Sequence, residues 1–271
     1  MSHNTYKDMS WSKQAQLGQQ GVLTGCDFNQ EWLLPLWWRS YIQWNRYPVC
    51  FLNFGMTPSG RYFCAKRGKV IDFYLPKQRL ASREDIPKLR AKFWDRMYPG
   101  DLWQARPAWF AKPCALLKTP FQTSIWIDLD GIVQGNLSPL FSCLKREPMG
   151  LVQASKRYQK ASRLVGLYFP KQPIYNTGVM LFRHGNPILK QWAQYSLFHN
   201  EAFFGDEHAF NHLLFQKKWS IVDLKQEMNW PLFEGENHNA LILHYLGSAG
   251  KQLLLQNYSV SYYLEEKQLN H

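Results

Sequence analysis

Short apolar runs and segments of helical periodicity alternate along the first part of the chain. The glycine-bounded run Gly21–Cys26 has the length and composition of a buried strand. A polar turn and the apolar-rich stretch Trp32–Trp44 follow, which predicts a helix with Pro35 in its first turn or at a kink. Tyr47–Phe54 then has strand composition. This order of strand, helix and strand predicts the start of a parallel sheet.

The alternation continues through the rest of the chain. Asp85 can cap a helix that ends at Pro99-Gly100, and its apolar positions recur at three and four residues: Ile86, Leu89, Phe93 and Met97. Ser124–Ile127 and Gly178–Phe182 are expected to be buried strands. The other predicted elements are helices opened by Asn186-Pro187 and Gly205-Asp206, and strands at Ser220–Asp223 and Ala240–Tyr245.

This order of elements predicts an α/β fold with a mostly parallel, Rossmann-like central sheet. In such sheets, ligands bind at the carboxyl edge of the strands. A length of 271 residues suits one large domain. We expect a single domain at residues 21–255, preceded by a polar N-terminal segment at 1–20 and followed by a C-terminal tail at 256–271.

The composition narrows the class of protein. Hydrophobic residues make up 45% of a chain without compositional repeats, which excludes a disordered or low-complexity protein. The five cysteines are widely spaced, without a C-x-x-C pair, and are expected to be buried thiols in a reducing compartment. The N-terminus lacks the pattern of a secretory signal, and no apolar run has membrane-spanning length, so we expect a cytoplasmic protein.

The chain is strongly basic, with a formal net charge of +12. Between Arg61 and Lys118 there are 14 Lys or Arg residues against 5 Asp or Glu residues. Such a concentration of charge could meet nucleic acid, anionic lipid headgroups or an acidic acceptor. A solvated basic face without a partner is the alternative interpretation.

Two carboxylates follow the predicted strand Ser124–Ile127 directly, as Asp128 and Asp130 in the sequence Asp-Leu-Asp-Gly. Hard divalent cations prefer oxygen ligands, and two carboxylates at this spacing can share one ion that neutralises a diphosphate. A D-x-D pair alone is weak evidence, because chance pairs occur on many solvated loops. The buried strand in front of this pair favours a metal site.

The residues around this pair resemble a known family. The segment Lys112–Leu140, KPCALLKTPFQTSIWIDLDGIVQGNLSPL, is similar to the core of the retaining glycosyltransferases of family 8, the glycogenin and lipopolysaccharide galactosyltransferase group. Further segments resemble that family's motifs in their order: Asn176–Gly178 its Asn-Ser/Thr-Gly motif, Gly205–Glu207 its Gly-Asp-Gln block, and His244–Gly247 its His-x-x-Gly element. The resemblance covers most of residues 21–251.

The resemblance implies a GT-A-type transferase that moves a hexose from a UDP-sugar donor with retention of anomeric configuration. It implies that Mn²⁺ or Mg²⁺ is bound by Asp128, Asp130 and His244. The residues expected to orient the donor sugar and act in catalysis are Asn176, Asp206 and Glu207. The residues expected to bind the nucleotide and its diphosphate are Thr24, Gly25, Cys26, Asp27, Lys112, Ile127, Leu129, Gly178, Gly247 and Lys251.

Two positions depart from the family pattern. Glu207 stands where the family usually has Gln, so that a carboxylate is available as a nucleophile or an extra metal ligand. Lys251 comes four residues after Gly247, whereas the phosphate-binding Lys of the family comes three residues after its Gly. These departures leave open a catalytically inactive scaffold of the same fold.

Two other classes are alternatives, namely a basic nucleic-acid-binding protein and another metal-dependent phosphate enzyme, such as a nucleotidyltransferase. The chain carries no recognised nucleic-acid motif, and no nucleic acid is expected as a partner. The acceptor is open among a glycan, a lipid-linked glycan, a protein and a small molecule. Our hypothesis is a bacterial surface glycan assembled at the inner membrane face, with peripheral contact of the basic region to that anionic surface.

Overall fold

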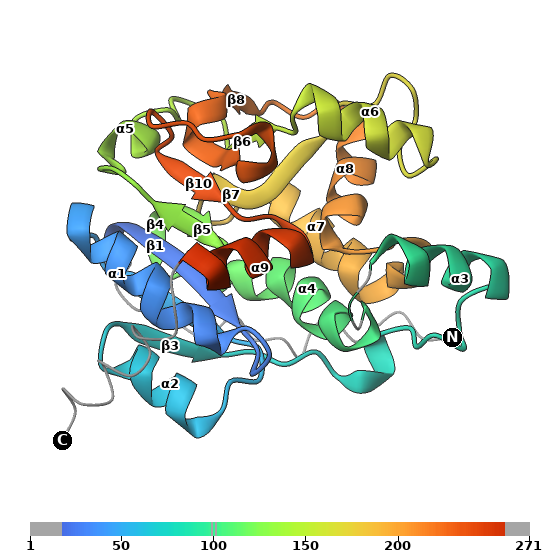
Figure 1. The fold of residues 1–271 in the computed structure, drawn as a ribbon, viewed down its shortest axis with the longest axis horizontal. Coiled ribbons are helices and arrows are strands. Elements are labelled where there is room, and N and C mark those ends of the chain that lie inside the picture. The colour runs from blue at the N-terminus through green and yellow to red at the C-terminus, as the bar shows by residue number, and fades with distance from the viewer. Residues whose placement is uncertain (1–17, 99, 101, 258–271) are drawn as a thin grey trace.

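A seven-stranded sheet runs through the centre of the molecule (Figure 1). The computed structural model describes residues 18–98, 100 and 102–257. The strands of this sheet are β1 (Gly18–Cys26), β2 (Val49–Asn53), β3 (Lys69–Asp72), β4 (Phe121–Ile127), β6 (Met149–Gln153), β7 (Tyr175–Arg183) and β8 (Val222–Leu224). Their order across the sheet is β3-β2-β1-β4-β7-β6-β8.

Only β7 runs against its neighbours in this sheet. It pairs antiparallel with both β4 and β6, whereas every other neighbouring pair is parallel. The prediction of an α/β fold with a mostly parallel sheet is therefore confirmed. Because β7 is reversed, its first residues lie beside the carboxyl end of β4, where the Asp128 backbone N–H donates to the Gly178 carbonyl at 2.8 Å.

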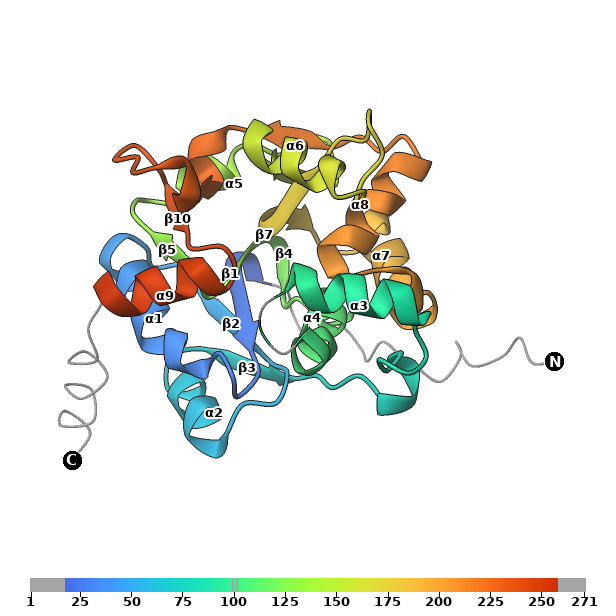
Figure 2. The ribbon, with the colours of Figure 1, turned by 45° about the vertical axis from the view of Figure 1, so that its right-hand side comes forward.

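Helices cover both faces of the sheet (Figure 2). They are α1 (Leu34–Trp44), α2 (Pro58–Ala65), α3 (Lys88–Met97), α4 (Leu102–Leu116), α5 (Ser138–Phe141), α6 (Lys156–Leu164), α7 (Pro187–Phe198), α8 (Asp206–Gln216) and α9 (Gly247–Asn257). Side chains along β4 alternate between the two faces, as the twofold period of a strand requires. Ile125 and Ile127 pack in the cluster that contains Trp37 of α1, and Trp126 packs in the cluster formed with α4, α7 and α8.

Several local predictions are confirmed by the structure. Pro35 lies in the first turn of α1. Asn186 caps α7, because its side chain accepts from the backbone N–H groups of Ile188 and Leu189. The five cysteines are free thiols, and all of them except the partly exposed Cys143 are buried.

None of the helices in the described part of the chain has the length and apolar character needed to cross a bilayer.

The apolar positions that predicted the helix after Asp85 do not form its buried face. The helix begins at Lys88, and Asp85 accepts hydrogen bonds from the backbone and hydroxyl of Ser82 in the preceding turn. Leu89 is 84% exposed, whereas Ala91 and Trp94 are buried. Trp94 buries more apolar surface than a leucine can, and this sets the rotation of the helix.

The predicted strand at residues 240–245 is not part of the main sheet. It is shorter, as β10 (Ile242–His244), and lies between β5 (Gly131–Val133) and β9 (Trp230–Pro231) in a separate three-stranded sheet. The division of the chain at residues 20 and 255 stays a prediction. β1 begins at Gly18 and α9 ends at Asn257, so both extend past residues 21–255, and the remainder of the predicted end segments lies outside the described residues.

The small sheet packs on β7 at Gly178. A Cβ added at Gly178 would lie 2.0 Å from Cε1 of His244 on β10, far inside normal contact distance. Glycine is needed here because the imidazole ring occupies the space of a side chain, and not because of an unusual backbone angle. Gly178 therefore lets His244 reach the carboxyl end of β4.

Gly178→Ala should lower the free energy of unfolding by about 1–3 kcal/mol, the usual cost of forcing extra atoms into a packed interior. The loss should be smaller in a His244→Ala background, because the ring that collides with the new methyl group is gone. Urea unfolding of the two single variants and the double variant measures this coupling. An equal loss in both backgrounds would show that Gly178 does not make room for His244.

Candidate active site and metal centre

The turn after β4 carries the two carboxylates singled out in the sequence. Its backbone is held on three sides. The Asp128 N–H donates to Gly178 of β7, the Gly131 N–H donates back to the Asp128 carbonyl at 2.9 Å, and the Tyr245 N–H donates to the Asp130 carbonyl at 2.9 Å. Hydrogen bonds from the small sheet and from β7 thus fix the positions of both carboxylates.

Asp130 is buried between two basic side chains. Its Oδ2 lies 2.9 Å from Nζ of Lys251, and its Oδ1 lies 3.2 Å from Nε2 of His244. Burial alone would raise the pKa of the Asp130 carboxyl, but Lys251 and His244 outweigh it and hold this pKa well below its usual range. Asp130 is therefore anionic near neutral pH.

Asp128 lies in a different environment. Its Oδ1 accepts from Nε1 of Trp126 at 2.6 Å and lies 3.7 Å from Nζ of Lys112. Burial raises the pKa of Asp128 above its usual range, against the attraction of Lys112. A further positive charge beside Asp128 would favour its carboxylate form.

Asp128, Asp130 and His244 are suited to bind a divalent metal ion. One possible ligand atom from each of the three residues lies within 4.8 Å of the others. Two carboxylate oxygens and an imidazole nitrogen form a donor set that suits Mn²⁺ and also Mg²⁺. This group agrees with the set expected from the sequence.

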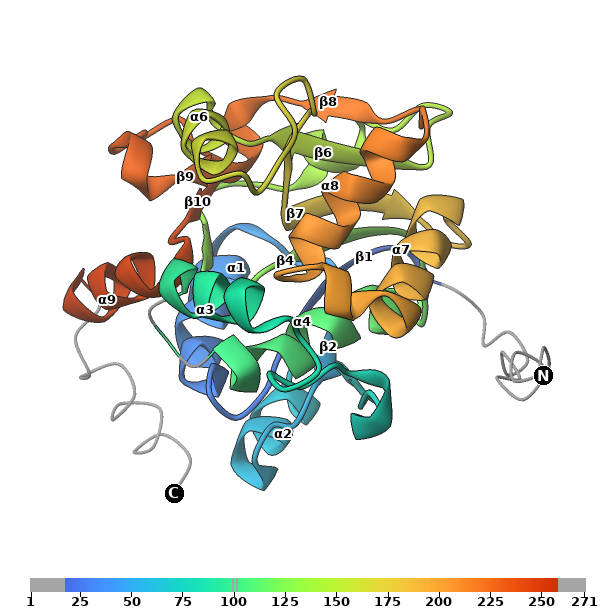
Figure 3. The same cartoon turned by 90° about the vertical axis from the view of Figure 1, so that its right-hand side faces the viewer.

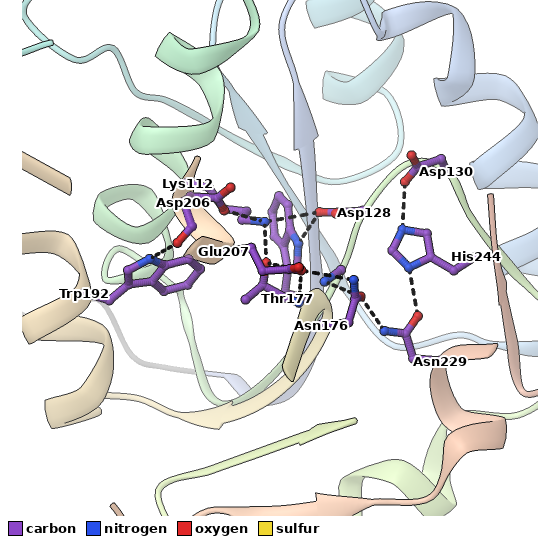
Figure 4. Close-up of polar contacts among 12 residues, drawn as sticks. Lys112, Asp128, Asp130, Asn176, Thr177, Trp192, Asp206, Glu207, Asn229 and His244 are labelled. Carbon is purple, nitrogen blue, oxygen red and sulfur yellow. Dashed lines mark hydrogen bonds and ion pairs between the residues drawn. The ribbon is translucent and has the colours of Figure 1, made fainter. Parts of the chain in front are cut away.

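The orientation of the His244 ring can be worked out from its neighbours (Figure 4). The Gly178 backbone N–H donates to Asn176 Oδ1 at 2.9 Å, which fixes which end of that amide is the oxygen. The amide of Asn229 must then donate to the same oxygen, at 2.7 Å, and its own Oδ1 faces Nδ1 of His244 at 2.9 Å. An amide oxygen only accepts, so Nδ1 of His244 carries a hydrogen.

The geometry around Nε2 of His244 therefore calls for a cation. In a neutral ring protonated at Nδ1, Nε2 presents a lone pair. That lone pair faces Asp130 Oδ1 at 3.2 Å, and two acceptors at this distance repel unless a proton or a metal ion lies between or beside them. A hydrogen bond to the second ring nitrogen of a metal-binding histidine is the usual arrangement, and Asn229 provides it here.

Lys112 of α4 links the carboxylates after β4 to the start of α8. Its Nζ lies 2.8 Å from Asp206 Oδ2 and 5.8 Å from the ring centroids of both Trp126 and Trp192. Burial would lower the pKa of Lys112, but Asp128 and Asp206 raise it above its ordinary value. The ammonium group therefore stays charged in a buried position between two carboxylates.

Glu207 is held by hydrogen bonds at the other end of the same network. Its Oε2 accepts from the Thr177 backbone N–H and from the Asn176 amide, each at 3.0 Å, and its Oε1 lies 3.4 Å from the hydroxyl of Tyr158. Burial raises the pKa of Glu207 to about 7, more than the hydrogen bond from Thr177 lowers it. The protonated and ionised forms of Glu207 are thus both accessible near neutral pH.

These residues line a cleft of about 460 Å³. Its floor is formed by the ends of β1, β4 and β7, and its walls by α4, α6 and the starts of α8 and α9. Of the residues expected from the sequence, those that line the cleft are Gly25, Cys26, Asp27, Lys112, Asp128, Leu129, Asp130, Asn176, Asp206, Glu207, His244, Gly247 and Lys251.

The three expected residues Thr24, Ile127 and Gly178 lie behind the cleft and are not part of its lining. Thr24 and Ile127 are completely buried. Packing alone requires glycine at position 25, because a Cβ there would lie 2.3 Å from the Leu52 carbonyl oxygen on β2. Asp27 holds the turn after β1, where it accepts from the backbone and the side-chain amide of Asn29.

Sequence reasoning missed several residues in and beside the cleft. Asn229 connects His244 to Asn176, and Tyr158 reaches Glu207 from α6. Tyr98, just after α3, and Trp109 of α4 also line the cleft. None of them belongs to a motif, and Asn229 lies in a short 3-10 helix, Gln226–Asn229, without a periodic signal.

A second cavity of about 380 Å³ adjoins the first one. Tyr158, Asn176, Glu207 and His244 line both cavities, so Glu207 lies at the junction between them. The rest of the second cavity is formed mainly by neutral polar and apolar side chains: Gln153, Ser155, Gln226, Asn229, Pro231 and Phe233.

The raised pKa of Glu207 predicts a pH-dependent stability. Its pKa in the fold is about 7 against an ordinary value of 4.5. The preference of the fold for the protonated form is fully present below about pH 4.5 and is lost as the pH rises through about 7. As the pH rises across this range, the wild-type protein should lose roughly 2–3 kcal/mol of unfolding free energy relative to Glu207→Gln, because Gln does not titrate. Urea unfolding of both proteins without metal, from pH 4 to 8, measures this difference in unfolding free energy. A difference that does not change with pH would contradict the raised pKa of Glu207.

Comparison with protein-family models and with curated protein sequences gives no match. The fold is similar to that of solved glycosyltransferases. Galactosyltransferase LgtC, in complex with donor and acceptor sugar analogues, gives a TM-score of 0.57 at 15% identity over 84% of this chain and 88% of LgtC. An active-site mutant of LgtC gives 0.56 at 15% identity over 84% of this chain and 87% of that one.

The similarity extends to a bacterial enzyme with a longer chain. The glycosyltransferase GlyE of Streptococcus pneumoniae, in its apo form, gives a TM-score of 0.52 at 16% identity over 85% of this chain and 55% of GlyE. At such low identity a structural match establishes the fold alone. The mostly parallel sheet, the reversed β7 and these matches together show that the chain has the GT-A fold of nucleotide-sugar transferases.

Proposed function

We propose that this protein is a metal-dependent glycosyltransferase that moves a hexose from a UDP-sugar to an acceptor, with retention of anomeric configuration. The observation that carries the proposal is the group Asp128, Asp130 and His244 at the floor of a cleft at the carboxyl edge of the sheet. Ligands of open α/β sheets bind at that edge. The choice of UDP, of a hexose and of retention follows the resemblance of the ordered motifs to family 8.

The charges in the cleft suit a diphosphate together with a divalent ion. Asp128, Asp130 and Asp206 face Lys112 and Lys251, which leaves an excess of negative charge on the floor of the cleft. A diphosphate alone would meet repulsion there. A bound Mn²⁺ or Mg²⁺ would neutralise the diphosphate and stabilise the charge that develops as UDP leaves.

Lys251 and Lys112 would add fixed positive charge near the leaving group. Lys251 comes from the first turns of α9, and Gly247 at the start of α9 has a φ of +70°, a conformation that favours glycine. Lys112 is held by Asp206, so its ammonium is oriented before any donor binds. We assign the diphosphate side of the cleft to these two lysines.

The sugar of the donor would lie between Asp206, Asn176 and Glu207. Glu207 accepts hydrogen bonds from Asn176 and Thr177 and lines both cavities. A carboxyl group with a pKa of about 7 can donate or accept a hydrogen bond near neutral pH, so Glu207 can replace the donor and acceptor groups of the glutamine that the family has here. This supports an active enzyme over an inactive scaffold.

We place the acceptor in the second cavity. It meets the first cavity at Glu207 and also at His244 of the metal group, so an acceptor hydroxyl there would approach the donor sugar from the side of the leaving diphosphate, as retention of configuration requires. Its amides and hydroxyls, with the ring of Phe233, suit an uncharged sugar, which combines hydroxyl groups with an apolar face that packs on aromatic rings.

Loss of the metal-binding carboxylate should abolish donor binding and transfer. In the wild-type protein, UDP with Mn²⁺ should raise the midpoint of thermal unfolding more than either ligand alone, because only the folded state holds both. Asp130→Ala should fold, lose this joint shift, and lose release of UDP from a UDP-sugar. A matched control is Asp223→Ala, which removes an exposed carboxylate outside the metal group. Full activity of Asp130→Ala would contradict the metal assignment.

A change in the second cavity should separate transfer from donor hydrolysis. Phe233→Ala should lower transfer to neutral mono- and disaccharides about fivefold, since a sugar loses an aromatic contact worth about 1 kcal/mol. Slow hydrolysis of the UDP-sugar by water should not change, because the donor cleft is intact. Kinetic assays of both reactions test this, and an equal loss of both would place Phe233 in the donor site.

A further inference from the structure

Two leucines are the most exposed large apolar side chains among the residues that the structure describes. Leu89 of α3 is 84% exposed and Leu164 of α6 is 77% exposed. Single exposed leucines are common on protein surfaces. These two are notable because each lies in a basic segment with further exposed apolar residues beside it.

The outer side of α3 combines apolar and basic side chains. Leu89 and Phe93 are four residues apart and share a face of the helix, and Phe93 is 37% exposed. The basic residues of the helix are Lys88, Arg90, Lys92 and Arg96. No carboxylate in the described part of the chain forms an ion pair with any of these four. The helix therefore presents uncompensated positive charge around an apolar centre.

The segment from α6 to residue 171 repeats this combination. Leu164 is followed by the exposed Val165 and Phe169. Residues 156–171 contain no Asp or Glu, and their basic residues are Lys156, Arg157, Lys160, Arg163 and Lys171. An unbroken positive segment with exposed apolar side chains is unusual on a surface that meets only water.

Both segments border the mouth of the donor cleft. Met97 and Tyr98 at the end of α3, and Val165 at the end of α6, line the cleft. Figures 1 and 3 show α6 above α3 on the same side of the molecule. The ring of Tyr168 packs edge-on against His208 of the cleft wall at 5.4 Å, which joins the α6 segment to α8.

We propose that α3 and residues 156–171 form a docking surface for an anionic lipid bilayer. The leucines and phenylalanines would insert at the level of the headgroups, and the Lys and Arg side chains would contact lipid phosphates. Charge complementarity selects this partner. Nucleic acid would match the charge but gives no reason for exposed leucines, and a second copy of the chain would bring two positive surfaces together.

This surface goes beyond the transfer reaction and does not depend on it. Docking through the two segments that border the cleft would turn its mouth toward the bilayer. An acceptor carried on a lipid could then reach the cavity beside Glu207 without leaving the membrane surface. Binding to lipid can be measured without any sugar donor, so the docking surface and the proposed activity stand or fall separately.

Sedimentation of the full chain with lipid vesicles tests the proposal. The protein should bind vesicles of phosphatidylglycerol and phosphatidylcholine in equal parts, and bind pure phosphatidylcholine vesicles far less. Leu89→Ser and Leu164→Ser should each weaken binding about tenfold, because each removes an apolar side chain from the bilayer interface. Replacement of Lys88, Lys92 and Lys160 by Gln should weaken it further and reduce its salt dependence.

A matched control changes a similar pair of residues elsewhere on the surface. Tyr62 of α2 is 62% exposed, with Nζ of Lys66 over its ring at 4.6 Å, and α2 lies at the end of the molecule away from α6 (Figure 3). Tyr62→Ser combined with Lys66→Gln should bind vesicles like the wild-type protein. The same variants should all keep their unfolding midpoints, since the changed side chains are exposed.

Several results would overturn the proposal. Equal binding to neutral and anionic vesicles, or no binding to either, would remove the electrostatic basis of the surface. Loss of vesicle binding in the α2 control, with full binding in both leucine variants, would assign lipid binding to α2 in place of α3 and residues 156–171. Tight binding of duplex DNA that both leucine variants retain would assign the basic residues to nucleic acid. A dimer in solution that Leu89→Ser dissociates would assign the face to a second copy.

Discussion

The hydrogen bond from the Gly178 backbone N–H to the Asn176 side chain sets the direction of the whole polar network in the cleft. A backbone N–H can only donate, so the oxygen of the Asn176 amide must face it. The amide nitrogen is then directed to Glu207, and Asn229 must present its oxygen to His244. Through three hydrogen bonds, one backbone donor in a strand thereby decides which nitrogen of His244 remains available to a metal ion.

The same network connects two chemically different regions of the cleft. On one side, Asp128, Asp130 and His244 form a donor set that suits a divalent cation. On the other side, Glu207 is half-buried with neutral donors around it, and desolvation raises its pKa to about 7. Lys112 lies between these regions, paired with Asp206 and near Asp128. Charge is therefore arranged along the cleft in the order that a nucleotide diphosphate followed by a neutral sugar would need.

The sequence predicted those parts of the fold and of the site that depend on local patterns. The carboxylates after β4 follow a buried strand that is recognisable from its apolar run, and Asn186 is recognisable as a cap from Asn-Pro. Asn229 could not be found in this way, since its partners Asn176 and His244 are distant in the chain.

The errors have physical causes as well. The periodicity of α3 is compatible with more than one buried face. The structure buries the larger Trp94 and leaves Leu89 exposed. The run at residues 240–245 does form a strand, but apolar composition does not say which sheet a strand joins. One of its two partners is β5, a strand of three residues directly after Asp130 that carries almost no pattern of its own.

The reversal of β7 has a consequence for where functional residues occur along the chain. In a parallel strand, the residues that reach the ligand edge come after the strand, as Asp27 follows β1 and Asp128 follows β4. In a strand of opposite direction they are the first residues, as Tyr175–Thr177 are in β7. A residue inserted within the first residues of β7 would therefore displace the cleft-lining side chains of Asn176 and Thr177, whereas one inserted after β7 would leave this edge of the cleft untouched.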